Sequence, residues 1–177
     1  MNRKIILAIF LVIQVLALIM FLIKLQYEYA YEILIIIAGA LSLIWYEKRS
    51  SLSIPDYILI LSLIAFSGHT IGGELLNLYA TSLVYDKILH VFGSYSFAML
   101  AYVLLGMDKL PLGRKIKFII IMTIGVYLGT IYELWEFGLD RFLDPPLPLQ
   151  SGLIDTNLDL LADLAGSTLA ALHLSRR

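Results

Sequence analysis

The sequence predicts an all-α, polytopic integral membrane protein with six transmembrane helices and both termini in the cytoplasm. Of its 177 residues, 60% are hydrophobic and 15% are charged, whereas soluble domains are about 45 to 50% apolar and about 25% charged. The apolar residues fall in blocks of about 20, the length that crosses a hydrocarbon core of about 30 Å. Basic residues gather on one side of these blocks, as they do on the cytoplasmic side of membrane proteins.

The blocks define a single membrane domain over residues 1–177. The first block follows Arg3 and Lys4, but it is longer than the apolar region of a signal peptide and lacks a small-x-small cleavage site. We therefore interpret it as a retained helix. The expected spans are about 5–23, 30–46, 54–73, 87–106, 116–139 and 154–174.

The orientation follows from the basic residues between the spans. With both termini inside, the outer loops hold Lys24, Lys87 and Arg141. The inner segments hold Arg3, Lys4, Lys48, Arg49, Lys109, Arg114, Lys115, Lys117, Arg176 and Arg177. Because positive charge marks the cytoplasmic side, we expect a multi-pass protein of the inner or plasma membrane.

Each span has its own features. The first two carry little chemistry beyond Gln14, and we interpret them as scaffold against membrane lipid. The third begins after Pro55, a residue tolerated at a helix start. Gly125-x-x-x-Gly129 in the fifth and Gly166-x-x-x-Ala170 in the sixth predict close helix packing. The sequence has no cysteine, which excludes disulfide, thiolate and iron–sulfur chemistry, and no basic patch indicates nucleic-acid binding.

Ionisable residues of the last four spans converge in the outer half of the bilayer. At 1.5 Å per residue, His69 and His90 lie about 6 Å below the outer ends of their helices. Glu133 and Glu136 lie roughly 4 to 9 Å deep, while Asp159 and Asp163 are roughly 6 and 12 Å deep. The remaining members of the cluster are Asp86 and Asp155.

The spacing of these residues predicts shared helix faces. Asp155, Asp159 and Asp163 recur every four residues, and Asp86 precedes His90 by four. A carboxylate within a membrane helix costs about 2.5 to 3.5 kcal/mol, so a cluster of them needs protons or a bound cation. Histidine beside carboxylates suits a divalent transition metal. The predicted metal ligands are His69, His90, Asp86, Asp155, Asp159 and Asp163.

A structural interpretation remains for some of these residues. Asp86 and Asp155 each suit a helix N-terminus, where a carboxylate caps amide groups or interacts favourably with the helix dipole. Capping does not account for Glu133, Asp159 or Asp163, which lie within spans. A histidine in a membrane helix is also often a hydrogen-bonded structural residue.

At these positions the chain resembles a family of bacterial inner-membrane proteins typified by YjdF. The resemblance covers about residue 54 to the end, with Lys87 where that family tends to have Arg. The chain is more distantly similar to VanZ-like proteins, which implies cell-envelope biology but no particular reaction. The YjdF-like motifs are His69-x-x-Gly72-Gly73, Asp86-Lys87-x-x-His90, Tyr132-Glu133-x-x-Glu136, and Gln150 followed by Asp155-x-x-x-Asp159. The VanZ-like motifs are Asp86-Lys-x-x-His90 and Asp159-Leu-Leu-Ala-Asp163-x-x-Gly166.

Three functions fit this pattern. The first is a metal-dependent enzyme acting on a lipid-linked or envelope substrate, with Glu133, Glu136 and Asp159 as catalytic residues and a divalent cation as cofactor. The second is a proton or cation transporter, because intramembrane carboxylates and histidines form such pathways. The third is a structural or accessory membrane protein whose polar network fixes helix packing.

Overall fold

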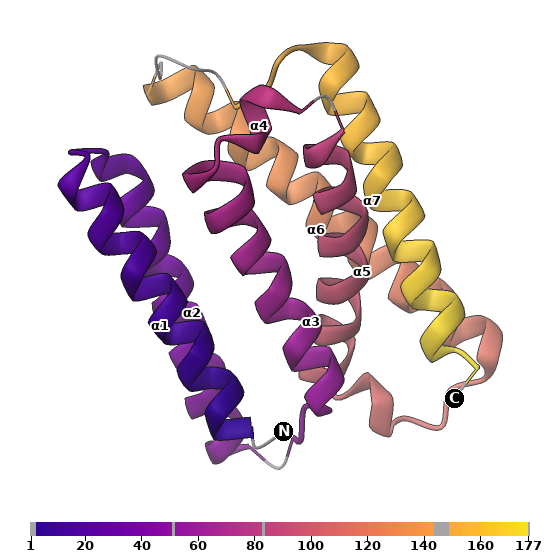
Figure 1. The fold of residues 1–177 in the computed structure, drawn as a ribbon. Helices are drawn as coiled ribbons and strands as arrows, with labels where there is room; N and C mark the ends of the chain where they lie inside the picture. The colour runs from indigo at the N-terminus through magenta and orange to yellow at the C-terminus, as the bar shows by residue number, and fades with distance from the viewer. Residues whose placement is uncertain (1–2, 51, 83, 144–148, 177) are drawn as a thin grey trace. The chain divides into compact units, whose positions relative to one another are not determined.

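The computed structural model describes residues 3–50, 52–82, 84–143 and 149–176, and these residues are almost entirely helical. The chain forms two compact units, Met1–Tyr85 and Asp86–Arg177. Figure 1 traces the helices in chain order. The all-α class is confirmed for the described residues, while a single domain over 1–177 stays a prediction.

The first unit is built on an antiparallel helix pair. Helix α1 (Arg3–Ile23) packs along α2 (Tyr27–Arg49), and Ala17 and Phe21 of α1 form a buried core with Ala30 and Ile33 of α2. The buried residues of α1 recur every three or four positions, so one stripe faces the unit while the rest is exposed and apolar. That stripe consists of Ile6, Phe10, Gln14, Ala17 and Phe21.

One arginine joins the starts and ends of three helices. The Arg3 guanidinium pairs with Glu47 of α2 at 2.6 Å and donates a hydrogen bond to the Ile54 carbonyl at 3.1 Å. The other Glu47 oxygen accepts the Ile54 amide at 2.8 Å. This clamp fixes the entry into α3 (Asp56–Ser67).

The third predicted span is not a uniform α-helix. After α3 the chain continues as a π-helical segment, η1 (Gly68–Leu75), and then folds back in a short helix, α4 (Leu78–Thr81). Asn77 makes this reversal in the left-handed conformation, at φ 57°, which asparagine tolerates better than most residues. The expected helix over 54–73 therefore exists, but its last two turns have a different register.

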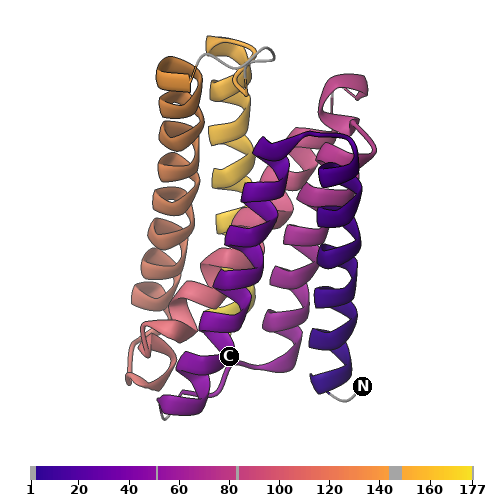
Figure 2. The ribbon, with the colours of Figure 1, turned by 90° about the vertical axis from the view of Figure 1, so that its left-hand side faces the viewer.

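The second unit contains three long helices. They are α5 (Tyr85–Leu104), α6 (Arg114–Leu143) and α7 (Leu153–Leu174), with a 3₁₀ turn, η2 (Met107–Lys109), between the first two. Each lies within a few residues of its predicted bounds, except that α6 extends four residues past 139. Figure 2 shows α6 and α7 side by side.

Small residues allow these three helices to approach closely. A Cβ at Gly125 would collide with Ser167 of α7 and Ala98 of α5. A Cβ at Gly166 would collide with the Val91 carbonyl and the Ser94 side chain of α5. The prediction that these glycines mark packing faces is confirmed.

Five segments within the described residues are long and apolar enough to cross a membrane. They are Arg3–Ile23, Tyr27–Arg49, Asp56–Leu75, Tyr85–Leu104 and Arg114–Phe142. Helix α7 has the length of a span but carries the aspartate row.

Candidate metal centre

The second unit gathers most of the predicted site residues at one end. Asp86 and His90 lie in the first two turns of α5, Glu133 lies late in α6, and Asp159 and Asp163 lie in the first half of α7. Because α6 runs antiparallel to α7, the end of one meets the start of the other. His90, Glu133, Asp159 and Asp163 are all buried.

Lys87 holds three carboxylates together. Its ammonium contacts Asp86 at 3.0 Å, Asp159 at 2.7 Å, and Asp155. Asp155 also accepts a hydrogen bond from the Ser151 amide, just before the start of α7. Asp155 is therefore anchored at the helix start, and its other oxygen is committed to Lys87.

His90 lies at the centre of the carboxylates. Its Nδ1–H donates to Asp163 Oδ1 at 3.2 Å. Its Nε2 faces Asp86 Oδ1 at 3.6 Å, and Glu133 Oε1 and Asp159 Oδ1 at 3.7 Å each. An imidazole whose first nitrogen is fixed by a carboxylate, with the second nitrogen free to bind, is the usual arrangement of a metal-ligating histidine.

Three carboxylates share one pattern around this nitrogen. Lys87 anchors one oxygen of Asp86 and one of Asp159, and the Gln150 amide donates to Glu133 Oε2 at 2.9 Å. The other oxygen of each points toward His90 Nε2. Two of these inner oxygens, Glu133 Oε1 and Asp159 Oδ1, are buried without a hydrogen-bond partner, which is costly for a charged group.

The spacing of the Asp86, His90 and Asp159 ligand atoms fits a small cation. Ligands held at about 2.0 to 2.2 Å in a tetrahedral shell lie about 3.3 to 3.6 Å apart, close to the distances measured from Nε2. The ligand atoms of Asp86, His90 and Asp159 all lie within 4.8 Å of one another. The donor set, one nitrogen and several carboxylate oxygens, suits a divalent transition metal.

Glu136 and Tyr132 lie beside this cluster. Tyr132 packs edge-on against His90, with ring centroids 5.7 Å apart. Glu136, one turn later in α6, is half-buried near Glu133 and His90. Gly129, one turn before Glu133, leaves the space that the Asp163 carboxylate occupies.

The remaining predicted ligand, His69, lies in the first unit. Its ring contacts Glu32 of α2, Glu74 of η1 and Tyr79 of α4. The sequence predicted only scaffold for the first two helices, whereas Glu32 of α2 contacts His69. An acidic residue within an apolar helix was the available signal, whereas nothing in the sequence indicated Tyr79.

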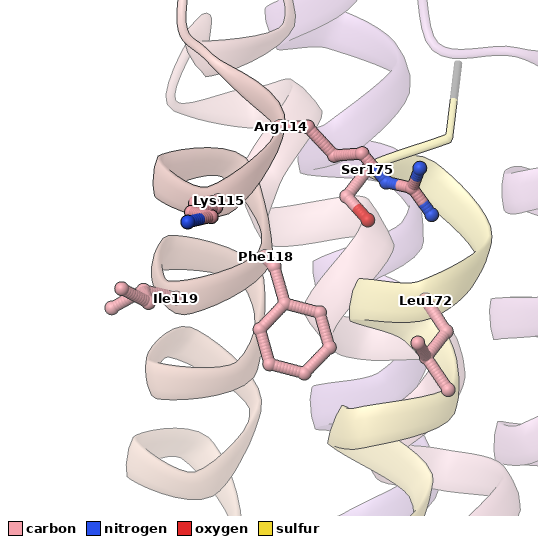
Figure 3. A pocket seen from close by; sticks show the side chains of 6 residues that line it. All are labelled: Arg114, Lys115, Phe118, Ile119, Leu172 and Ser175. Carbon is pink, nitrogen blue, oxygen red and sulfur yellow. The ribbon is translucent and has the colours of Figure 1, made fainter.

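A groove of about 490 Å³ lies at the other end of the second unit, lined by residues from the start of α6 and the end of α7 (Figure 3). Arg114 and Phe118 lie on its α6 side, and Leu172 and Ser175 on its α7 side. It contains none of the predicted site residues. The predicted site residues of the second unit lie at its opposite, acidic end.

Comparisons with known proteins agree with the helical architecture. The family described as predicted membrane protein (DUF2238) matches residues 5–177. A protein of Thermotoga maritima, named only as uncharacterized, is 33% identical over 133 residues, covering 72% of this chain and 67% of its own length. No solved structure matches. The family match is consistent with the YjdF-like resemblance, while the VanZ-like resemblance stays a prediction.

Proposed function

This chain belongs to the DUF2238 family of predicted membrane proteins, and from that premise we propose a metal-dependent membrane enzyme. It is a multi-pass protein of the cell membrane that holds a divalent transition metal among α5, α6 and α7. The metal acts on a lipid-linked substrate of the cell envelope. The observation that carries the proposal is the pair of buried, unpartnered oxygens, Glu133 Oε1 and Asp159 Oδ1, that face His90 Nε2.

Charge balance supports a cation at this position. Asp86, Glu133, Asp159 and Asp163 surround His90, and Lys87 supplies one positive charge nearby. A divalent ion held by Asp86, His90 and Asp159 would neutralise two further charges and give the buried Asp159 Oδ1 a partner. Asp163 would serve as a positioning residue that orients the imidazole, as carboxylates do for metal-bound histidines.

The chemistry follows from what such a metal supplies: polarisation of a phosphoryl or acyl oxygen and activation of bound water. Glu136 is the candidate general base, because it lies beside the cluster without facing His90 Nε2. Lys87 is the candidate group for stabilising negative charge at the same end of α5. Tyr132, four residues before Glu136 on α6, packs against His90.

Exposed apolar side chains beside the cluster favour an amphiphilic substrate. Trp135 and Phe142 of α6 and Leu153 and Ile154 of α7 are largely exposed around the acidic end. An acyl or prenyl chain would lie against them while its head group reaches the carboxylates. The VanZ-like resemblance also points to the envelope, and the depth expected from the sequence supports a position near the outer leaflet.

A sixth span is part of the proposal. The acidic residues of α7 face α5 and α6, whereas its exposed residues are mainly leucines, so the lipid-facing surface is apolar despite the aspartate row. Those leucines are Leu153, Leu158, Leu161, Leu164, Leu169 and Leu172. With six spans the termini share the cytoplasmic side. Because the chain has no cysteine, K24C and R176C variants test this directly: with α7 as a sixth span, an impermeant thiol reagent should label the first from outside and not the second, which follows α7.

The function is tested with purified protein in nanodiscs, loaded with Mn²⁺ or Zn²⁺ and given polyprenyl-phosphate and phospholipid substrates. The wild type should release a head-group product, and E136Q should lose activity while keeping its metal. D159N should lose activity together with the ion of this centre, and D108N, an exposed acid in η2, should lose neither. Equal metal content in wild type and D159N would refute the centre.

Transport remains the alternative if metal binds without turnover. Beyond Asp163, the buried residues of α7 are Gly166, Ser167, Ala170 and Ala171, and the Ser167 hydroxyl is committed to the Asp163 carbonyl at 2.6 Å. This supports binding at one end rather than passage. Proteoliposome flux of protons or Mn²⁺ under a gradient would reverse that preference. Normal folding and activity in both D159N and E133Q would instead indicate a purely structural network.

A further inference from the structure

A second cluster of metal-ligand type surrounds His69 in the first unit. His69 Nε2 lies 3.2 Å from Glu74 Oε1 and 3.5 Å from Glu32 Oε2. The three ligand atoms lie within 4.8 Å of one another. Glu32 comes from α2 and the other two from η1, so helices far apart in sequence supply the set.

The π-helical turn creates this cluster. His69 and Glu74 are five residues apart, and in an α-helix that spacing would place them about 140° apart around the axis. In a π-helix the hydrogen bonds run from residue i to i+5, as between the Leu76 amide and the Ile71 carbonyl at 2.9 Å, so residues five apart lie on the same side of the helix. Such turns occur frequently at functional sites.

The chain reversal after η1 positions the other side of the imidazole. With Asn77 in the left-handed conformation, α4 returns over the turn, and the Tyr79 hydroxyl lies 2.6 Å from His69 Nδ1. The Tyr79 ring occupies the space that a Cβ at Gly73 would fill. Gly73 therefore has to be a glycine for Tyr79 to reach the histidine.

A second tyrosine fixes the start of the turn. Tyr85 donates a hydrogen bond to the Gly68 carbonyl at 2.8 Å, and its ring lies where a Cβ at Gly72 would be. Gly72 therefore makes room for Tyr85, and Gly73 makes room for Tyr79. Together these contacts hold His69 with Nδ1 occupied and Nε2 directed at two carboxylates.

One carboxylate oxygen of the cluster lacks a partner. The Glu74 side chain is only 3% exposed, and its Oε2 is buried without a hydrogen bond. We infer that Glu32, His69 and Glu74 form a second divalent transition-metal site, separate from the centre at His90 and beyond the proposed function. Two carboxylates balance the charge of the ion, and Tyr79 acts as the positioning residue for Nδ1.

The competing interpretation is a protonated His69 paired with Glu74 and Glu32 and no metal. The two differ in stoichiometry. Purified full-length protein is stripped with chelator, loaded with Co²⁺, desalted and analysed for metal per chain and for its visible absorption. The wild type should hold two ions.

Variants assign each ion to its site. H69Q and E32Q should each lose one ion and keep the other, while H90Q should lose the complementary one. E28Q is the matched control, because Glu28 is an exposed acid one turn earlier in α2, and it should keep both. Y79F keeps all three ligands and should weaken the second site about 10- to 100-fold, so it tests the inference even if H69Q misfolds.

Two results would overturn the second site. Full wild-type stoichiometry in E32Q and H69Q would mean that the cluster is an ion pair. A single ion lost in both H69Q and H90Q would mean that the two histidines serve one centre. Loss of metal in H69Q with none lost in H90Q would instead refute the His90 centre and leave the second site standing.

Discussion

Replacing Lys87 by Met should destabilise the second unit more than any single surface charge would. The ammonium contacts Asp86, Asp155 and Asp159, whose side chains are 28%, 25% and 3% exposed. The two partly solvated pairs should each contribute at most about 1 kcal/mol. Asp159 is different, because losing its cation leaves a buried charge uncompensated, at about 3 to 5 kcal/mol.

We therefore expect K87M to lose about 4 kcal/mol of unfolding free energy, or roughly 10 °C in Tm for a chain of this length. The measurement is thermal unfolding in detergent with chelator present, so that bound metal does not mask the loss. K115M, which removes an exposed lysine at the start of α6, is the control and should change Tm by less than about 2 °C.

A double variant separates the loss of the buried Lys87–Asp159 ion pair from the loss of packing around the Lys87 side chain. K87M/D159N removes both charges and should recover much of the stability, giving a coupling energy within the 0.5 to 3 kcal/mol range of contacting residues. The reasoning is refuted if K87M unfolds within about 1 kcal/mol of the wild type, or if D159N adds its full penalty to that of K87M.

Two further substitutions test the packing around the clusters. G129A should displace the Asp163 carboxylate, and so weaken metal binding and lower Tm. G138A is the control: a Cβ there meets nothing within 4 Å, and Tm should rise slightly because alanine favours helix over glycine. Equal Tm changes in the two variants would contradict this. Q14L should leave the free energy of unfolding unchanged or raise it. Gln14 Oε1 is already without a partner, and Thr70 keeps its hydrogen bond to the Phe66 carbonyl at 3.1 Å. If Q14L lowers the free energy of chemical unfolding by more than about 1 kcal/mol, the Gln14–Thr70 hydrogen bond contributes to stability.

The second unit was predictable because its polar residues follow the α-helical period. Asp155, Asp159 and Asp163 recur every four residues, and Asp86 precedes His90 by four, so their faces follow from regular geometry. Helix length and direction then bring the end of α6 beside the start of α7. What the spacing did not provide was the role of Gln150, whose amide approaches Glu133 from the loop before α7.

The first unit was less predictable for a local reason. On a regular α-helix His69 and Glu74 would lie on different faces. The wider π-helical turn brings them to the same side. Tyr79 reaches His69 because Asn77 reverses the chain, and a single left-handed residue is not evident from hydrophobic periodicity. Glu32 is evident in the sequence as an acid in an apolar helix, but its contact with His69 is not.

The asymmetry of the second unit has an electrical consequence. Its carboxylates lie at one end, while Arg114 and Lys115 lie at the other. In the proposed topology, with both termini in the cytoplasm, a divalent ion entering the proposed His90 centre would cross about a fifth of a potential that is worth about 2.3 kcal/mol per charge and 100 mV. An energised membrane would then favour occupancy by about 1 kcal/mol per 100 mV, or about fivefold, so the metal content of the site would follow the energy state of the cell.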